Sequence, residues 1–477
     1  MSKSLDTPSS NLSELDSPRL DSLDDAKLRN SELMYELNDK PSFLPASFAA
    51  LQHLLASIVA IVTPTLIVAG TLGLGAYIPY LISCALISSG IGTYIQCKKI
   101  GPIGAGMLCL QGTSFAFLTA IISAGLIVKA RGGTPEDILA TIFGVSFCAA
   151  FIEVILSRFI HKLKRIFTPV VTGTIIILIG IPLIEVSMTD IAGGFGAEDF
   201  GSLQNLLLGM IVLVSVIVFN RSKNPLLRLS SIVIALILGM VAAFFMGRLD
   251  FSALNNVGFI NIPIPFRFGF QFDITAFIPL VILYCVSALE TTGDLTANSV
   301  ISKEPVKGPV YLNRIQGGVL ADGVNSMIAA ALNSMPSTTF SQNNGVIALT
   351  GVASRHVGIY IASAMVIIGL FPIFGAILQT MPQPVLGGAT LVMFGTVAVA
   401  GIRVLASATL DRRDMLIIAT SVGMGIGVSM VPEVLSQLPE LVRNVLISPV
   451  AIGAITAILL SLFLPVEGNV DTQNSDV

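Results

Sequence analysis

The sequence predicts an all-α polytopic membrane protein with fourteen transmembrane spans. Of its 477 residues, 53% are hydrophobic and 12% are charged, where soluble domains carry roughly 25% charged residues. The apolar residues gather in runs of about 20, the length that a helix needs to cross a bilayer. These runs are continuous rather than alternating, which argues against a β-barrel. The mean hydropathy of +0.86 fits the same class, and nothing in the composition suggests a nucleic-acid partner.

The elements follow in order from apolar runs separated by polar breaks. Residues 1–43 are rich in Ser, Asp and Leu and lack the pattern of a secretory signal, so we expect a disordered acidic cytoplasmic tail. The first seven spans are expected at 45–70, 74–96, 102–128, 135–158, 166–188, 202–220 and 228–247. The second seven are expected at 274–297, 313–332, 335–353, 357–379, 383–405, 413–432 and 446–466, and residues 468–477 form a second cytoplasmic tail.

Basic residues test this count, because cytoplasmic loops carry an excess of Lys and Arg. With the N-terminus inside, the cytoplasmic loops hold Lys98, Lys99, Lys162, Lys164, Arg165, Arg221, Lys223, Arg228, Lys303, Lys307, Arg314, Arg355, Arg412 and Arg413. The opposite loops hold few: Lys129, Arg131, Arg248, Arg267 and Arg443. The asymmetry supports the count of fourteen spans and predicts a multi-pass membrane protein with both termini in the cytoplasm.

An odd number of spans in each half gives the two halves opposite orientations, as in inverted-repeat transporters with sites on broken helices near the bilayer midplane. Interrupted stretches occur at matching places, GPIGAGMLCLQGTSF in the third span and STTFSQNNG after Pro336 in the tenth. We expect each to begin extended, continue as a half-helix and cross the other where the backbone is buried or lines a cavity. Gln111 and Gln342 are expected as matching amides, and Gly345 is expected to leave space for the crossing.

Ionisable side chains inside the predicted spans are costly and therefore functional candidates. Glu290 and Asp294 share one face of the eighth span through their i,i+4 spacing. Two carboxylates one turn apart repel unless one holds a proton or finds a hydrogen-bonding partner. Asp322 lies in the ninth span and His53 in the first. Glu153 lies near the cytoplasmic end of the fourth span, where its carboxylate is expected to extend to the interface.

Each candidate also has a structural interpretation. The carboxylates could be hydrogen-bonded links between spans, and His53 could be a packing histidine. Gln342 could cap a half-helix rather than touch a ligand. Thr113 and Ser114 are expected as helix N-caps, and capping does not exclude that they line the site.

Together the candidates suit a small planar heterocycle with alternating N–H and C=O edges. A carboxylate such as Glu290 accepts N–H groups, whereas the Gln342 amide both donates and accepts. Half-helix N-termini favour a carbonyl oxygen, and Phe115 can cover a flat face. A sugar, a peptide or a naked metal ion fits less well, and the protonatable residues favour coupling to protons.

Cysteine and histidine usage argues against a metal centre. The five cysteines lie scattered in apolar runs without a C-x-x-C pair, and the three histidines are far apart. This pattern is typical of small packing residues. The sequence therefore predicts no disulfide, no metal site and no cofactor.

The motifs resemble those of the nucleobase–ascorbate transporters, also called nucleobase:cation symporter-2. The family signature is [Gln/Glu/Pro]-Asn-x-Gly-x4-Thr-[Arg/Lys/Gly], and the stretch from Gln342 to Gly351, QNNGVIALTG, matches it completely. The pair Gln52-His53, the glutamate Glu290, the triplet ADG and the stretch PQPVLGGATLVMFG also look like the family pattern. The resemblance runs from about Tyr35 to about Pro465.

This resemblance implies a 7+7 inverted repeat, a homodimer and elevator-like alternating access. It implies a core domain at 44–158 and 251–380 and a gate domain at 159–250 and 381–467. The substrate-binding residues are expected to be Glu290, Gln342, Phe115, Ser341 and Ser114. The residues that organise the site or couple it to protons are expected to be His53, Asp294, Asp322, Asn343 and Gln111. The signature accepts any residue at Asn344, which receives no role.

Gln342 at the first signature position resembles the purine branch, because bacterial uracil permeases carry Glu there. The resemblance therefore implies a symporter that imports xanthine with protons, its partners being the purine, membrane lipid and a second copy of the chain. Xanthine permeases can have Asn where this chain has Ser114, and the smaller side chain leaves room for the extra oxo group of uric acid. A uracil or other nucleobase permease of the same family is the alternative.

Other classes are disfavoured. An intact Glu290 argues against an inorganic-anion transporter of the same fold. An intramembrane enzyme would need nucleophile-base or metal-ligand spacing, which the sequence lacks. A channel would need a ring-forming selectivity motif in one of its spans, and none is present. We therefore expect a transporter and not an enzyme.

Overall fold

The computed structural model describes residues 33–160, 168–194, 196–224, 227–228, 230–249, 251, 254, 258–406 and 408–464. The expectations for residues 1–32 and 465–477 and for Lys162, Lys164 and Arg165 lie outside these ranges. The first half contains α2 (Phe43–Leu72), η1 (Gly75–Tyr77), α3 (Ile78–Lys98), β1 (Gln111–Thr113), η2 (Phe115–Phe117), α4 (Leu118–Ala130), α5 (Pro135–Leu156), α7 (Pro169–Ile191), α8 (Leu203–Asn220) and α10 (Ser231–Phe245). The second half contains α11 (Ile274–Ile301), α12 (Gly308–Ala331), β2 (Ser337–Thr339), α13 (Ser341–Thr350), α14 (Arg355–Leu370), α15 (Ile373–Gln379), α16 (Gln383–Ala406), α17 (Arg412–Met430), η4 (Pro432–Leu435), α18 (Glu440–Leu446) and α19 (Pro449–Phe463).

Each of the fourteen predicted ranges overlaps a helix of this set. Within the described residues, eight helices are long and apolar enough to cross a membrane, or nine if α14 and α15, bent by 76°, form one span. The remaining predicted ranges differ for physical reasons. The third and tenth divide between a strand and a short helix, α10 and α19 are short apolar helices, and α12 carries several polar side chains.

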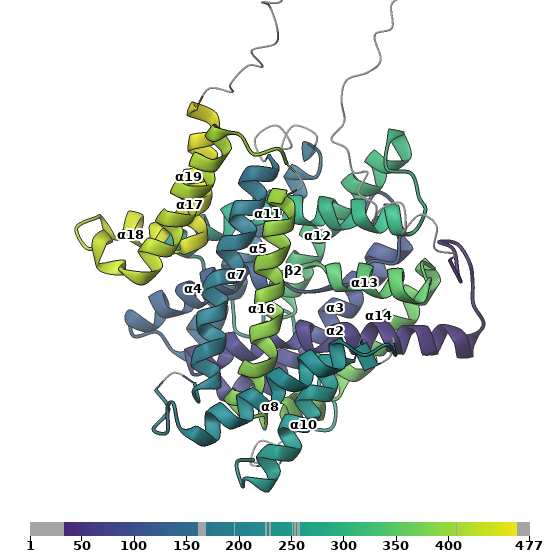
Figure 1. Ribbon diagram of the computed structural model, residues 1–477, viewed down its shortest axis with the longest axis horizontal. Coiled ribbons are helices and arrows are strands. Elements are labelled where there is room, and N and C mark those ends of the chain that lie inside the picture. The colour runs from purple at the N-terminus through teal and green to yellow at the C-terminus, as the bar shows by residue number, and fades with distance from the viewer. Residues whose placement is uncertain are drawn as a thin grey trace, which may run out of the picture.

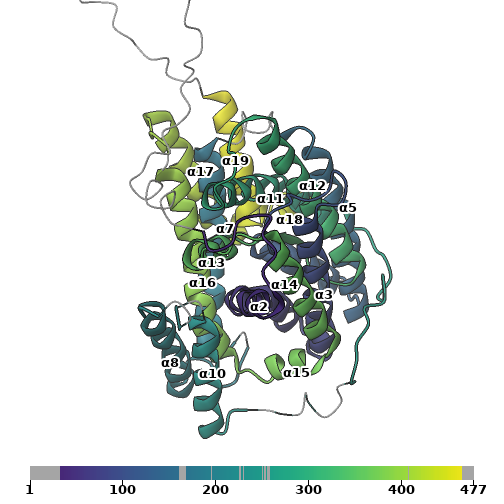
Figure 2. The ribbon, with the colours of Figure 1, turned by 90° about the vertical axis from the view of Figure 1, so that its right-hand side faces the viewer.

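The helices pack in two groups (Figure 1). In the first group α3 packs on α14, and α5 packs on α11 and α12, with α2 lying between α3 and α13. In the second group α7 packs on α16, α8 packs on α10 and α16, and α17 packs on α19. Figure 2, which views α2 nearly along its axis, shows α8 and α10 on one side of it and α3 and α14 on the other. Fewer contacts join the groups, mainly between α11 and α18 and between α2 and α10.

Glycines allow the tightest helix pairs to approach, as is usual where helices pack within a bilayer. A Cβ at Gly180 of α7 would lie 2.5 Å from the backbone nitrogen of Ala398 in α16. A Cβ at Gly323 of α12 would lie 2.8 Å from the backbone nitrogen of Val154 in α5. Side chains at these positions would force the backbones apart.

The segment 33–42 is docked on the protein, which corrects the expectation of a disordered tail as far as residue 43. The Gly351 carbonyl accepts hydrogen bonds from the backbone N–H groups of Met34 (2.8 Å) and Tyr35 (3.2 Å). In return, the backbone N–H of Ala353 donates to the Tyr35 carbonyl at 2.9 Å. The apolar pattern did not reveal this segment because it is short: backbone hydrogen bonds hold it in place together with a few apolar side chains, among them the buried Leu37.

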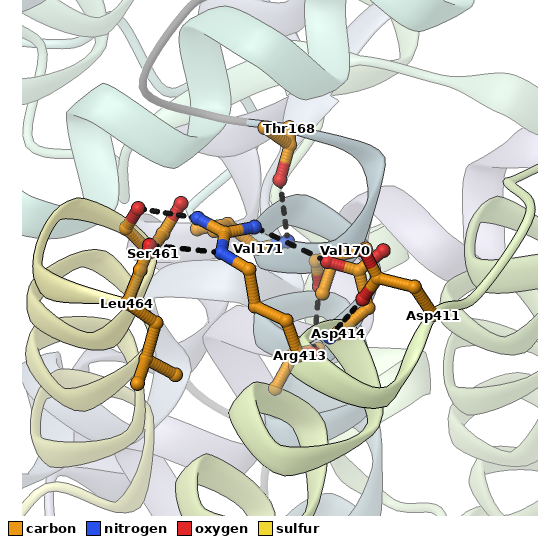
Figure 3. Close-up of polar contacts among 9 residues, drawn as sticks. Thr168, Val170, Val171, Asp411, Arg413, Asp414, Ser461 and Leu464 are labelled. Atoms are coloured by element: carbon orange, nitrogen blue, oxygen red, sulfur yellow. Dashed lines mark hydrogen bonds and ion pairs between the residues drawn. The ribbon is translucent and has the colours of Figure 1, made fainter. Parts of the chain in front are cut away.

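Polar side chains hold the ends of α17 and α19 together (Figure 3). Arg413 donates from Nε to the Leu464 carbonyl (3.0 Å) and from Nη2 to the Ser461 carbonyl (2.5 Å). Asp411 caps α17 by accepting a hydrogen bond from the backbone N–H of Asp414 at 2.7 Å. Helix ends leave backbone groups without intrahelical partners, so these contacts satisfy one end of each helix and link the two.

Candidate functional site

Two short antiparallel strands meet at the centre of the first helix group. We call residues 108–117 and 336–345 the strand crossing; in it Gln111 pairs with Thr339 and Thr113 pairs with Ser337. Each strand leads into a short helix, η2 and α4 after β1 and α13 after β2. The predicted sequence of extended start and half-helix is therefore confirmed in both halves of the chain.

The residue that makes the crossing possible is Gly112, not Gly345 as the sequence suggested. A Cβ at Gly112 would lie 2.6 Å from the ring of Phe340 and 2.8 Å from the Ile61 side chain. A Cβ at Gly345 would meet nothing within 4 Å, because that residue lies on the exposed side of α13. The close approach occurs between the strands and α2, before α13 begins.

Thr113 and Ser114 differ in what they contact. The Thr113 hydroxyl donates to the carbonyl of Ile61 in α2 and caps no helix, so that expectation was wrong. The Ser114 hydroxyl accepts from the backbone N–H of Ala116 at 3.3 Å and caps η2, as predicted. Ser114 also donates its own backbone N–H to the Pro336 carbonyl at 2.9 Å, which extends the strand pairing.

Asp322 of α12 is the most connected carboxylate of the crossing. Its Oδ1 accepts from Gln111 Nε2 at 2.7 Å. Its Oδ2 accepts from the hydroxyls of Thr291 (2.5 Å), Thr338 (3.2 Å) and Ser287 (3.5 Å). The side chain is fully buried. Asp322 therefore joins both strands to α11, the link that the sequence interpretation allowed for it.

Gln111 and Gln342 are not matching amides. Gln111 is fully buried in β1, where its amide donates to Asp322 and accepts from the Ser337 hydroxyl at 2.9 Å. Gln342 lies in the first turn of α13, after β2 has ended, and is exposed. Gln342 is not the cap of that helix either, since the N-cap is Phe340 and no side chain caps it.

Asn343 holds α2 and the segment that leads into β1 against α13. Its Nδ2 donates to the Leu108 carbonyl at 2.7 Å, and its Oδ1 lies 2.8 Å from His53 Nδ1. A carbonyl only accepts, so Asn343 must present its NH2 to Leu108 and its oxygen to His53. His53 therefore carries a proton on Nδ1, and its buried Nε2 has no partner among the described residues.

Glu290 and Asp294 lie on α11 beside the start of α13. Asp294 Oδ2 accepts from the Thr339 hydroxyl at 2.9 Å, and its backbone carbonyl accepts from Asn344 Nδ2 at 3.0 Å. Asn344, to which the sequence gave no role, thus links α13 to α11. Glu290 differs, because its Oε2 is buried and receives no hydrogen bond from the described residues. The alternative that Glu290 is a hydrogen-bonded link between spans is therefore not supported at this oxygen.

On one side of the crossing, where α11 contacts α13, several residues are exposed, and we call this side the open face. Ser341 and Gln342 are exposed at the start of α13, and a Cβ at Gly293 of α11 would meet nothing within 4 Å. Phe115 of η2, which contacts α11, stands edge-on to Phe394 of α16, with 5.1 Å between ring centroids. The open face thus combines a carboxylate, an exposed amide and an aromatic pair that spans the two helix groups.

Sequence reasoning missed several participants. Glu153 does not reach the interface, because the end of α5 packs beneath α11 and α12 and leaves the side chain fully buried. Asn298 of α11 donates to the Leu108 carbonyl at 2.8 Å, and Thr291 binds Asp322. Only the helical spacing of Thr291 and Asn298 from Asp294 could have indicated that they face the crossing.

The site offers no cluster for a metal. Among the residues that the structure describes, no group of three or more His, Cys, Asp or Glu side chains could hold a metal ion. Arg and Lys take part in none of the hydrogen bonds to Asp322 or Asp294 given above. The chemistry available is hydrogen bonding, proton exchange and aromatic packing.

Comparison with solved structures finds a similar fold in two other proteins. The transmembrane domain of the cyanobacterial bicarbonate transporter BicA superposes with a TM-score of 0.54 at 15% identity, covering 88% of this chain and 99% of that chain. Murine Slc26a9, an anion transporter, superposes with a TM-score of 0.56 at 13% identity, covering 89% of this chain and 69% of that chain. At these identities the likeness concerns the fold alone.

Sequence comparison gives the family. A model of the permease family matches residues 45–434. Xanthine permeases XanP and XanQ of Escherichia coli are each 44% identical over 447 residues, 93% of this chain and 96% of each relative. A putative purine permease of Clostridium perfringens is 38% identical over 440 residues, 92% of this chain and 94% of the relative. The chain belongs to the nucleobase–ascorbate transporter family.

Proposed function

We propose that this chain imports purine nucleobases, xanthine foremost and uric acid as well, together with protons. The observation that carries this proposal is the open face of the crossing. There Glu290 of α11 has a carboxylate oxygen that receives no hydrogen bond from the described residues, and α11 contacts α13, whose start is uncapped and carries the exposed Gln342. The xanthine permeases XanP and XanQ, at 44% identity, point to the same class of substrate.

The chemistry of a purine dione fits these groups. Xanthine presents ring N–H donors next to carbonyl acceptors on a flat ring. Glu290 would accept N–H groups, whereas Gln342 would donate to a carbonyl and accept from a neighbouring N–H. The uncapped N–H groups and the partial positive charge at the start of α13 favour a carbonyl oxygen. Phe115, held edge-on by Phe394, would cover one face of the ring.

The experiment is uptake of labelled xanthine by cells that lack their own purine permeases. Glu290→Ala is expected to abolish uptake, whereas Glu198→Gln, an exposed carboxylate in the loop after α7, is expected to leave it unchanged. A protonophore should abolish uptake by the parent. Uptake by Glu290→Ala at the parental rate would reject the binding role, and uptake that persists with the protonophore would reject proton coupling.

Proton coupling is proposed because, among the described residues, no basic side chain forms an ion pair with the buried acids of the crossing. Glu290, Asp294 and Asp322 lie on adjacent helices, and none forms an ion pair among the described residues. Several carboxylates this close in a low-dielectric interior cannot all ionise. The set therefore carries protons, and substrate binding at Glu290 changes how they are shared.

We further propose a 7+7 inverted repeat of fourteen spans with core and gate domains. The packing supports it, because helix pairs come in counterparts. The second span packs on the eleventh (α3 on α14) as the fourth packs on the ninth (α5 on α12). Likewise the sixth packs on the seventh (α8 on α10) as the thirteenth packs on the fourteenth (α17 on α19).

The two helix groups would be the domains, with the core at 44–158 and 251–380 and the gate at 159–250 and 381–467. The sparser contacts between the groups suit a core that moves along the gate, an elevator-type mechanism in a homodimer. The protein would lie in the bacterial inner membrane with both termini in the cytoplasm. Cross-linking of cysteines placed on α11 and α18, with and without xanthine, tests this movement.

Acceptance of uric acid is proposed from Ser114. Its side chain is short and already caps η2, so it leaves more room next to Phe115 than an asparagine would. Competition uptake should show weaker inhibition by urate in Ser114→Asn than in the parent. Equal urate affinity in the two proteins would remove this part of the proposal, and inhibition by uracil rather than by purines would favour a uracil permease.

A further inference from the structure

Glu153 is a fully buried acid that the proposed binding site does not use. It lies in the last turns of α5, where its relative exposure is 0%. Neither Oε1 nor Oε2 receives a hydrogen bond from a described residue. A buried carboxylate without donors is strongly disfavoured. Its environment must therefore supply either a cation or a proton.

The described surroundings supply no cation. From α12 the group that faces Glu153 is the Asp322 carboxylate, and from α11 it is the Ser287 hydroxyl with Cys285 and Tyr284 nearby. The third helix that packs against α5 is α4. Its one basic side chain, Lys129, lies in its last turn and donates to the Leu72 carbonyl. Arg158, on the same chain segment as Glu153, is exposed. Among the described residues, every ionisable group that faces Glu153 is thus an acid or neutral.

Asp322 has room for one more donor, and only on one oxygen. Its Oδ2 already accepts from the hydroxyls of Thr291 (2.5 Å) and Thr338 (3.2 Å), whereas Oδ1 accepts only the amide of Gln111. A carboxylate oxygen offers two acceptor sites. Two ionised carboxylates cannot bond to each other, but a protonated Glu153 can donate its O–H to Asp322. The proton satisfies Glu153 and completes the acceptor positions of Asp322.

We propose that Glu153 is a positioning residue for transport: it shares one proton with Asp322 and thereby holds the strand crossing in its working geometry. This rests on the proposed function as a nucleobase permease. When the shared proton leaves, both acids are charged and repel, and Asp322 is pushed from Gln111 in β1 and Thr338 in β2. Because these strands lead directly into η2 and α13, the substrate side chains move with them.

In this proposal α5 acts on the strand crossing through Asp322, although none of its residues belongs to the proposed binding site. Rising pH removes the shared proton, so exchange of substrate should fall on the alkaline side. Cys285 and Tyr284 are neutral near physiological pH, so they do not supply this dependence. The other acids that act on Asp322 are Glu290 and Asp294, and both remain in the variants below.

The test is exchange of labelled for unlabelled xanthine in proteoliposomes with the same pH on both sides. No proton gradient exists there, so the dependence of the exchange rate on pH reports the protonation state of the protein and not the driving force. Glu153→Gln keeps the shape and a permanent N–H donor toward Asp322. We expect its exchange near neutral pH to stay close to that of the parent, and the alkaline fall to move upward by about one pH unit or more, as for strongly coupled sites.

Three further proteins make the result decisive. Glu153→Asp keeps the acid but withdraws it by one methylene, and we expect its alkaline fall to begin at lower pH than in the parent. Glu153→Ala should lose exchange throughout, and Glu198→Gln, exposed in a loop, should follow the parental profile. Binding of xanthine to each purified protein near neutral pH is measured in parallel.

A parental alkaline profile in both Glu153→Gln and Glu153→Asp would overturn the proposal and leave Glu153 a packing residue. If Glu153→Gln does not fold, Glu153→Asp alone decides by the direction of its shift. Failure of the proposed function looks different, because then the parent itself would neither bind nor exchange xanthine at any pH. A shifted profile with intact xanthine binding supports the inference.

Discussion

Replacing Asn343 with alanine should destabilise the strand crossing. The substitution removes the hydrogen bonds to His53 Nδ1 (2.8 Å) and to the Leu108 carbonyl (2.7 Å), both fully buried. The two losses differ, because the Leu108 carbonyl still accepts from Asn298 Nδ2 at 2.8 Å. Among the described residues, His53 Nδ1 has no other acceptor, and its Nε2 is already without a partner.

The magnitude follows from this difference. A buried donor left unsatisfied costs about 1–3 kcal/mol, and the loss of a hydrogen bond whose acceptor keeps another donor costs about 0.5–1.5 kcal/mol. Asn343→Ala should therefore lower the free energy of unfolding by roughly 2–4 kcal/mol. The neighbouring Asn344 makes one hydrogen bond, to the Asp294 carbonyl. Asn344→Ala should cost only about 0.5–1.5 kcal/mol.

The assay is unfolding of the purified proteins in mixed detergent micelles, with the melting temperature as a second readout. Asn344→Ala is the matched control, one residue away on the same helix. Equal stability of the two variants, or a larger loss for Asn344→Ala, would refute the reasoning that Asn343 ties α2 and the segment that leads into β1 to α13.

Three further predictions concern other parts of the chain. Gly112→Ala should abolish xanthine uptake, since its Cβ would overlap an aromatic ring at 2.6 Å, whereas Gly345→Ala, with open space around it, should retain uptake. The hydrogen bond from Arg248 holds the pKa of Asp199 below its ordinary value. The ionised form is therefore stabilised by folding, and this stability is present at neutral pH and lost as pH falls through the folded pKa. Asp199→Asn should lower the melting temperature at pH 7, and the difference from the parent should shrink as pH falls below the ordinary pKa of Asp. Arg413→Met should lower the free energy of unfolding by about 2 kcal/mol, because charge-assisted bonds to the end of α19 disappear; an unchanged unfolding curve would contradict that role.

Much of the helical framework could be predicted from the sequence, since apolar runs of span length have few alternatives in a membrane protein. The strand crossing could also be predicted, because Gly, Pro and Ser/Thr residues interrupt the third and tenth ranges. The 76° bend between α14 and α15, the short helix α18 and the docked segment 33–42 could not. They depend on contacts between distant parts of the chain and leave no apolar periodicity.

The sequence could identify those site residues that are ionisable and therefore cost free energy inside an apolar span. Glu290, Asp294, Asp322 and His53 are expensive inside an apolar run, and the structure brings all of them to the crossing. The hydrogen-bond partners of these residues could not be assigned in this way. Glu153 was misplaced because sequence position alone could not show that α12 covers the end of α5.

The central claim is that Glu290 binds a planar purine at the open face of the crossing. Equilibrium binding of labelled xanthine to purified protein tests it most directly, without any assumption about coupling or movement. A hydrogen bond to a charged group contributes about 1.5–3 kcal/mol, so Glu290→Gln should weaken xanthine binding by roughly 10–150-fold. The fold should be intact, since Glu290 Oε2 receives no hydrogen bond from the described residues. Xanthine binding of parental affinity in a folded Glu290→Gln protein would contradict the account.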